Sequence, residues 1–135
     1  MKSLLPIAIV LALATAYGLW YQRSRGKVVV KSDKGLITES MIGVALGSRA
    51  TLVQFSSAFC SPCRATRALL EDVTADMADV VHTEIDAEAN LELVRTLDIR
   101  STPTTLFLDR NGHEVGRAMG APKRDQVLSA ISAIR

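Results

Sequence analysis

Two cysteines separated by two residues are the part of this chain whose types and spacing point most directly to chemistry. They lie in Cys60-Ser61-Pro62-Cys63 and are the only two cysteines among 135 residues. One helical turn brings sulfurs with this spacing within bonding distance, so such a pair can cycle between dithiol and disulfide. The alternatives are two buried structural cysteines or half of a zinc site, but the only histidines, His82 and His113, form no pair with ligand spacing. The spacing therefore favours redox chemistry.

A strand and a helix must position this pair. The apolar run Leu52, Val53 and Phe55, within residues 51–64, predicts a buried strand that breaks at residues 56–58, and a helical pattern begins after the cysteines. Free backbone N–H groups and the positive end of the helix dipole at such a junction favour a thiolate on Cys60. Proline at position 62 fits the first turn, where its missing N–H costs nothing.

At these residues the chain resembles the thioredoxin superfamily. Its sequence FCSPCR, residues 59–64, is similar to that family's usual active-site sequence WCGPCK. Residues 101–104, Ser-Thr-Pro-Thr, followed by an apolar run at 106–108, resemble the family's cis-proline loop and the strand after it. Asn111-Gly112 and residues 119–121 fall where the family has a hairpin turn and a later glycine. The resemblance covers about residues 27–135 and implies a thioredoxin-like α/β fold.

The resemblance also implies roles for the site residues. Cys60 is expected to attack a substrate disulfide, and Cys63 to resolve the resulting mixed disulfide. Pro103 is expected to be cis and to lie beside the cysteines, with the backbone of Thr102 pairing with the bound substrate chain. Phe59 replaces the family's tryptophan beside the reactive sulfur and joins these two as a substrate-binding residue. No cofactor beyond the cysteine pair and no metal are expected.

Two positions depart from the family pattern. Gln54 stands where thioredoxins carry a buried aspartate, six residues before the first cysteine, and His82 stands where they carry a lysine. An amide cannot accept the proton of the resolving thiol. One hypothesis is that His82, or a water held by Gln54, supports that proton transfer. The alternative, which we favour because histidines are common on strands without a function, is that both are merely satisfied polar groups at the edge of the core. Phe59 and Ser61 also differ from the family beside the reactive sulfur and leave the direction of the reaction open. Arg64 replaces the family's lysine and either adds positive potential near the thiolate or is a solvated helix residue.

The remaining pattern predicts an alternating fold. We expect strands over residues 28–31, 79–86, 104–109 and 114–119, and helices over residues 39–44, 65–77, 87–97 and 123–134. Gly47 is expected to end the first of these helices, and the second is expected to bury Ala65, Leu69, Val73 and Met77. The order βαβαβαββα predicts a mixed central sheet with helices on both faces.

The N-terminal segment forms a separate unit. Residues 4–21 carry no charge and are long enough to cross a bilayer as a helix, and Tyr17, Trp20 and Tyr21 gather at one end like an interfacial belt. Ala14-Thr15-Ala16 allows a cleaved signal peptide, but the apolar run continues past it, which favours an uncleaved anchor. We therefore expect an anchor and basic connector over residues 1–26 and the thioredoxin-like domain over residues 27–135.

Charge bears on partners and on the side of the membrane. The basic residues that follow the apolar segment outnumber the single Lys2 before it, so the positive-inside rule places the domain at the cytoplasmic face, whereas an export signal would place it outside. Residues 23–34 are expected to contact lipid headgroups. From residue 27 onward the chain has 13 Lys and Arg and 14 Asp and Glu. A domain so close to neutral shows no excess of basic charge that would indicate nucleic-acid binding.

The sequence thus predicts a membrane-tethered, monomeric thiol-disulfide oxidoreductase that acts on protein disulfides and is recharged by a partner such as a thioredoxin reductase or a membrane thiol donor. An extracytoplasmic domain would instead serve disulfide oxidation, isomerisation or thiol reduction in cytochrome maturation. A different class of function is a non-catalytic thioredoxin-like binding module, or a protein that binds copper(I) through the two thiolates.

Overall fold

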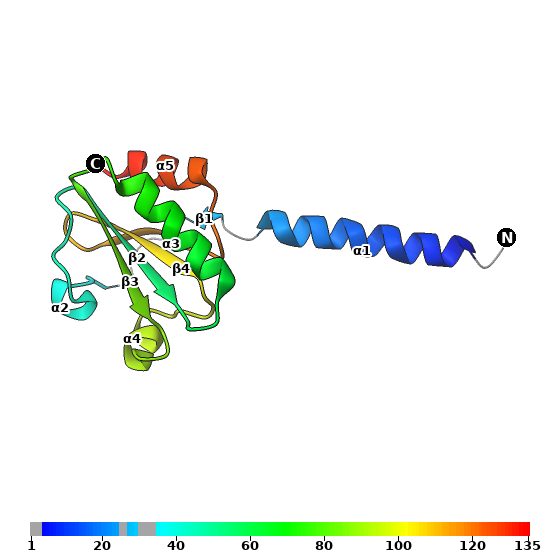
Figure 1. The fold of residues 1–135 in the computed structure, drawn as a ribbon, viewed down its shortest axis with the longest axis horizontal. Coiled ribbons are helices and arrows are strands. Elements are labelled where there is room, and N and C mark those ends of the chain that lie inside the picture. Colours follow the sequence, from blue (N-terminus) through cyan, green and yellow to red (C-terminus); the bar gives the residue numbers. More distant parts are fainter. Residues whose placement is uncertain (1–3, 25–26, 30–34) are drawn as a thin grey trace.

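The computed structural model describes residues 4–24, 27–29 and 35–135. These residues form an N-terminal helix and an α/β domain (Figure 1). The elements in chain order are α1 (Leu4–Ser24), β1 (Val28–Val29), α2 (Glu39–Ile42), β2 (Ala50–Ser56), α3 (Ser61–Thr74), β3 (Val80–Asp86), α4 (Leu91–Thr96), β4 (Thr104–Asp109), β5 (Glu114–Met119) and α5 (Arg124–Ala133). From β1 onward the order is the predicted βαβαβαββα.

The five strands form one mixed sheet in the order β1-β5-β4-β2-β3. Strands β2 and β3 run parallel, and the other neighbouring pairs are antiparallel. The strand that leads to the cysteines, β2, lies inside the sheet, and all seven of its residues are buried. Strand β1 lies at the edge, as predicted for residues 28–31, of which 30 and 31 lie outside the described residues.

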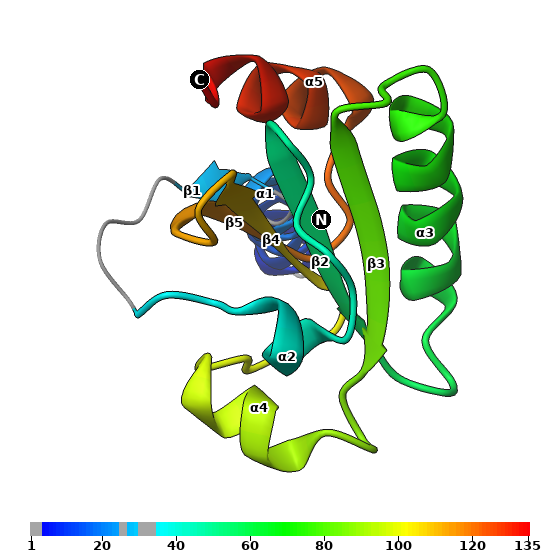
Figure 2. The same cartoon turned by 90° about the vertical axis from the view of Figure 1, so that its left-hand side faces the viewer.

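Helices cover both faces of the sheet, as predicted (Figure 2). Successive residues of a strand point to opposite faces. Leu52 accordingly packs with α3 and α5 in one apolar cluster, whereas Val53 and Phe55 pack with α2 and α4 in another. Because β2 contributes to both clusters, the strand that leads into the cysteine pair is held rigidly from both sides.

Helices α4 and α2 are shorter than predicted, and α5 is shorter by one residue at each end. Residues 87–90 form a turn rather than the start of α4, because Asp86 accepts the Glu88 N–H on its carboxylate and the Asn90 amide on its backbone oxygen. Helix α2 ends at Ile42, and Gly43 rather than Gly47 closes it, since Gly43 adopts the left-handed φ of 75° that commonly ends helices.

The buried face of α3 also differs from the prediction. Its buried residues are Cys63, Thr66, Leu70 and Val73. Of the predicted residues, Val73 is buried, Leu69 and Met77 pack half-buried against the core, and Ala65 is exposed. A spacing of four residues overshoots a full turn by about 40°, so a strict four-residue series winds around the helix, while alternating steps of three and four stay on one side. The consequence is that Cys63 itself points into the core. Helix α5 buries Val127 and Ile131 as predicted.

Helix α1 projects from the domain (Figure 1). It has 21 residues, an 18-residue stretch of it has a mean hydropathy of 1.8, and none of its residues is buried. At 1.5 Å per residue it is about 31 Å long, close to the thickness of a bilayer's hydrocarbon core. It is therefore long and apolar enough to span a membrane, a test that N-terminal signal sequences also pass.

Candidate active site

The cysteine pair lies at the predicted junction between strand and helix. Strand β2 ends at Ser56, three residues follow, and Cys60 occupies the N-cap position of α3 with Pro62 in the first turn. The two sulfurs are joined in a disulfide, with the Cα atoms 5.2 Å apart. The Cys63 N–H points at Cys60 Sγ from 3.2 Å. Cys63 is 2% exposed and Cys60 is partly exposed, so Cys60 is the sulfur that a bulky substrate reaches first.

A proline loop lies against the loop that leads to the pair. The Thr102–Pro103 peptide bond is cis, as expected from the resemblance. The Thr102 hydroxyl lies 3.0 Å from the Ser57 hydroxyl in the loop before the cysteines, and the Gly120 N–H donates to the Pro103 carbonyl over 2.8 Å. These contacts join three segments that are far apart in sequence: the loops before α3 and before β4, and the end of β5.

Two of the three expected substrate-binding residues line a surface hollow. Thr102 and Pro103 line it together with Pro62, Met119 and Gly120. Phe59 is fully exposed, so its ring lies open to solvent directly before Cys60. The hollow beside the proline loop, which Pro62 joins to the cysteine pair, thus has a largely apolar lining.

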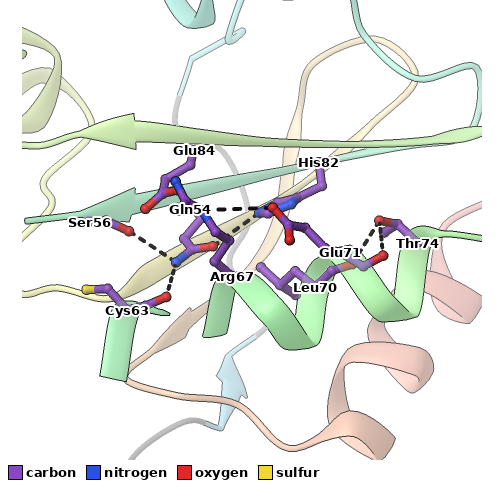
Figure 3. Close-up of polar contacts among 9 residues, drawn as sticks. All are labelled: Gln54, Ser56, Cys63, Arg67, Leu70, Glu71, Thr74, His82 and Glu84. Atoms are coloured by element: carbon purple, nitrogen blue, oxygen red, sulfur yellow. Dashed lines mark hydrogen bonds and ion pairs between the residues drawn. The ribbon is translucent and has the colours of Figure 1, made fainter. Parts of the chain in front are cut away.

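Gln54 lies buried beneath the pair on β2. Its amide nitrogen donates to the Cys63 carbonyl over 2.9 Å and to the Ser56 hydroxyl over 3.1 Å (Figure 3). Because a carbonyl oxygen only accepts, the amide nitrogen must face Cys63, and the amide oxygen then faces His82 Nε2 at 3.1 Å. That contact places the hydrogen of the imidazole on Nε2.

His82 faces charged groups from two elements. Glu71 and Arg67 approach from α3, and Glu84 lies two residues further along β3 (Figure 3). Burial lowers the pKa of His82 below 6.5; the two carboxylates oppose this shift and Arg67 reinforces it. The imidazole is therefore neutral at pH 7 and donates to Gln54. Because the amide separates it from Cys63, this arrangement suits a positioning role better than direct acceptance of the thiol proton.

Comparison with known proteins identifies the family. The thioredoxin family model matches residues 40–133. The chain belongs to the thioredoxin family. Thioredoxin H5 of Oryza sativa subsp. japonica is 29% identical over 102 residues, which cover 76% of this chain and 75% of the rice protein. The thioredoxin of Chlamydia pneumoniae is 30% identical over 87 residues, 64% of this chain and 84% of that protein.

Solved thioredoxins share the fold. Thioredoxin NaTrxh from Nicotiana alata matches with a TM-score of 0.59 and 27% identity, over 65% of this chain and 75% of that one. Fasciola hepatica thioredoxin matches with a TM-score of 0.58 and 25% identity, over 66% and 84% of the two chains. Together with the bonded cysteine pair, membership of the thioredoxin family makes this chain a thiol-disulfide oxidoreductase.

This thioredoxin has a second, charged hollow beside the cysteines that the sequence analysis missed. It is lined by both cysteines and by Arg67, Glu84 and Asp86, and Arg67 forms an ion pair with Glu84 (Figure 3). The signal was present in the alternation of β3, since residues two apart on a strand share a face and His82 was already placed. Strand β3 lies about 20 residues after the cysteines in the sequence, so local patterns could not show that its side chains line a hollow with them.

Proposed function

We propose that this thioredoxin reduces or exchanges disulfides in proteins while α1 holds it at a membrane. The observation that carries the proposal is the Cys60–Cys63 pair at the start of α3, preceded by a loop whose Ser57 contacts Thr102 of the cis Thr102–Pro103 bond. A reversible disulfide needs one sulfur open to the substrate and a second within bonding reach, and the different exposure of the two cysteines provides this.

Reduction begins with the Cys60 thiolate. The helix dipole and the N–H of Cys63, 3.2 Å from Cys60 Sγ, favour the negative charge. The thiolate attacks one sulfur of the substrate disulfide, forms a mixed disulfide and releases the other substrate sulfur as a thiolate, which takes up a proton. Cys63, as a thiolate, then attacks Cys60 Sγ and releases the second substrate sulfur. Two electrons pass to the substrate, and the Cys60–Cys63 disulfide is left.

The proline loop and Phe59 position the substrate in this proposal. An extended substrate chain pairs with the backbone of Thr102, its apolar side chains contact Phe59 and Pro103, and the scissile disulfide lies over Cys60. Gln54 holds the Cys63 carbonyl, and His82 holds Gln54 in turn. These two residues orient the resolving cysteine from below. The protein needs no cofactor, because the cysteine pair itself carries the electrons.

A membrane setting follows from α1 in this proposal. The helix stays attached as an anchor, residues 23–34 contact lipid headgroups, and the domain acts as a monomer at the cytoplasmic face, as the positive-inside rule favours. A thioredoxin reductase or a membrane thiol donor returns two electrons to the pair after each turnover. Residues 27–135 then form the whole catalytic domain.

The first test is the reduction potential of the pair. Full-length protein in detergent micelles is equilibrated with glutathione buffers, and its thiols are counted by alkylation and intact mass. Because the chain has only two cysteines, the count reports this pair alone. A potential near the −270 mV of thioredoxin supports a reductase at the cytoplasmic face. A potential near −120 mV contradicts it and indicates an extracytoplasmic oxidant.

The second test traps the intermediate. Cys63→Ser should accumulate a mixed disulfide between Cys60 and oxidised glutathione, since the resolving sulfur is missing. Cys60→Ser, the matched control, should form no adduct, because Cys63 is buried. Adducts are measured by intact mass after acid quenching. A Cys60→Ser variant that turns over disulfides as fast as wild type would show that Cys60 is not the attacking cysteine.

A further inference from the structure

We propose that the substrates are disulfides of other membrane proteins, in segments that lie close to the bilayer surface from which α1 emerges. This inference rests on the proposed membrane-anchored function and adds the class of substrate to it. It depends on where the tether joins the domain, which is set by the pairing of the edge strand and not by the cysteines themselves.

The tether is short. If α1 spans the bilayer with Tyr17, Trp20 and Tyr21 in the interface, its last residue, Ser24, lies at the membrane surface. Three residues separate Ser24 from Val28, the first residue of β1. Fully extended, those four peptide units reach only about 14 Å. The domain therefore stays within one short arm of the lipid.

We call the hollow lined by Pro62, Thr102 and Pro103 the substrate groove. The tether joins the domain at the end of the sheet that holds this groove. Val28 pairs with Ala118 near the end of β5, and the next residue, Met119, pairs with Thr104 directly after the cis-proline. The path from Ser24 to Pro103 is thus roughly 30 Å when every step is fully extended. Attachment at the opposite end would have added the domain's own diameter of about 35 Å.

The end of α1 also lies beside the groove. Gln22 and Ser24 line the same hollow as Pro62, Thr102 and Pro103. Figure 1 shows α1 leaving the domain next to β1, on the side where α3 begins. The groove therefore faces the membrane side, and a folded soluble substrate would have to enter between the groove and the lipid. A juxtamembrane segment of a neighbouring membrane protein already lies in that space.

The test places one disulfide at two distances from a bilayer. Full-length protein is reconstituted in phosphatidylcholine vesicles with a single-span peptide whose rigid extramembrane helix carries a disulfide-linked thiol reporter. The reporter lies either about 5 Å or about 45 Å beyond the bilayer, that is, roughly three or thirty helical residues at 1.5 Å each. Because tethering raises effective concentration only where both groups can meet, we expect the near disulfide to be reduced at least about tenfold faster. Equal rates overturn the inference.

A lengthened tether is the matched variant. A twelve-residue Gly-Ser insertion between residues 25 and 26 extends the mean reach by about 20 Å and leaves every residue of the groove unchanged. We expect it to reduce the distant disulfide nearly as fast as the near one. A variant that keeps the wild-type preference for the near disulfide contradicts the tether argument.

Two further measurements separate this inference from the proposed function. Wild type and the insertion variant should reduce oxidised glutathione in solution at the same rate, and both should float with the vesicles in a density gradient. If wild type does not reduce oxidised glutathione, both the proposed oxidoreductase site and the inference are refuted. Wild type that reduces glutathione and floats but shows no distance preference refutes the inference alone. Protein that stays out of the vesicles refutes the anchor and therefore the inference.

Discussion

Cys63 is held from below by an amide, where a carboxylate would both accept a proton and repel a thiolate. Gln54 donates to the Cys63 carbonyl and accepts from His82, so it fixes the backbone of the resolving cysteine without taking part in acid-base chemistry. Changing this one group to an acid of the same shape tests how the resolving thiol loses its proton.

Gln54→Glu should make resolution depend on a buried carboxyl group. A carboxylate in contact with His82 raises the pKa of that imidazole, because opposite charges favour the charged form, and it also offers a proton acceptor beneath Cys63. We expect faster decay of the mixed disulfide near neutral pH, measured by stopped-flow quenching and mass. Gln54→Met, which removes the polar contacts without adding an acid, should slow that decay. A Gln54→Glu profile identical to wild type would exclude this path for the proton.

His82 should make stability depend on pH. Its pKa is lowered mainly by burial, so the folded state binds fewer protons than the unfolded state as the pH falls through 6.5. The contribution of neutral His82 to the free energy of unfolding is therefore complete above this pH. The free energy of unfolding should decrease on acidification until the pH falls below the lowered pKa. Urea unfolding followed by far-ultraviolet circular dichroism measures it.

Two variants bracket that measurement. His82→Gln should flatten the decline, whereas His113→Gln, at an exposed hairpin position, should keep it. If the free energy of unfolding of His82→Gln decreases on acidification as much as that of wild type, the pH dependence arises from other groups. His82→Ala decides the separate question of proton transfer, because an unchanged pH profile of mixed-disulfide resolution leaves only the positioning role.

At the scale of elements, a buried ion pair within β5 includes an arginine that also holds the segment leading to the cis-proline. Arg117 and Glu114 are each 5% exposed and paired at 2.7 Å. The same guanidinium donates to the carbonyls of Leu97 and Asp98, at the end of α4, over 3.1 and 3.2 Å. The position of the loop before Pro103 therefore depends on a side chain from the neighbouring hairpin.

Arg117→Met should cost about 3–5 kcal/mol of unfolding free energy, because it leaves the Glu114 carboxylate buried without its partner. The matched control is Arg124→Met, which breaks the exposed pair between Arg124 on α5 and Asp72 on α3 and should cost less than about 1 kcal/mol. Urea denaturation measures both. An Arg117→Met loss as small as the control's would mean that this pair does not hold the loop.

These elements also show what the sequence could predict. The junction at Cys60, the order of the elements and the mixed sheet follow from local periodicity and the family resemblance, because each depends on residues close in sequence. The contact of Gln54 with His82 and the hollow with Glu84 depend on the parallel register of β2 and β3, which pairs residues 30 apart. Periodicity sets which face a residue takes but not which residue of another strand lies opposite. The early end of α2 and the late start of α4 depended on single backbone and side-chain contacts.

At the scale of the whole molecule, tryptophan and tyrosine lie only in α1 and not in the domain. The single tryptophan and both tyrosines lie in α1, where Tyr17 contacts Trp20 and Tyr21. The thioredoxin domain has only phenylalanines, so Trp20 fluorescence describes the environment of the helix alone. This makes the insertion of α1 measurable in the unmodified protein.

Trp20 should lie at the interface of the bilayer. An amphipathic indole prefers the headgroup level, and its position near the end of a helix about 31 Å long matches that depth. We expect blue-shifted emission in phosphatidylcholine vesicles and stronger quenching by lipids brominated near the headgroup than by lipids brominated near the chain ends. A Trp20→Phe, Leu11→Trp variant, with its indole at mid-helix, should reverse that order. Wild-type emission that is not quenched by brominated lipids would mean that α1 does not insert, which would contradict both the proposed anchor and the proposed juxtamembrane substrates.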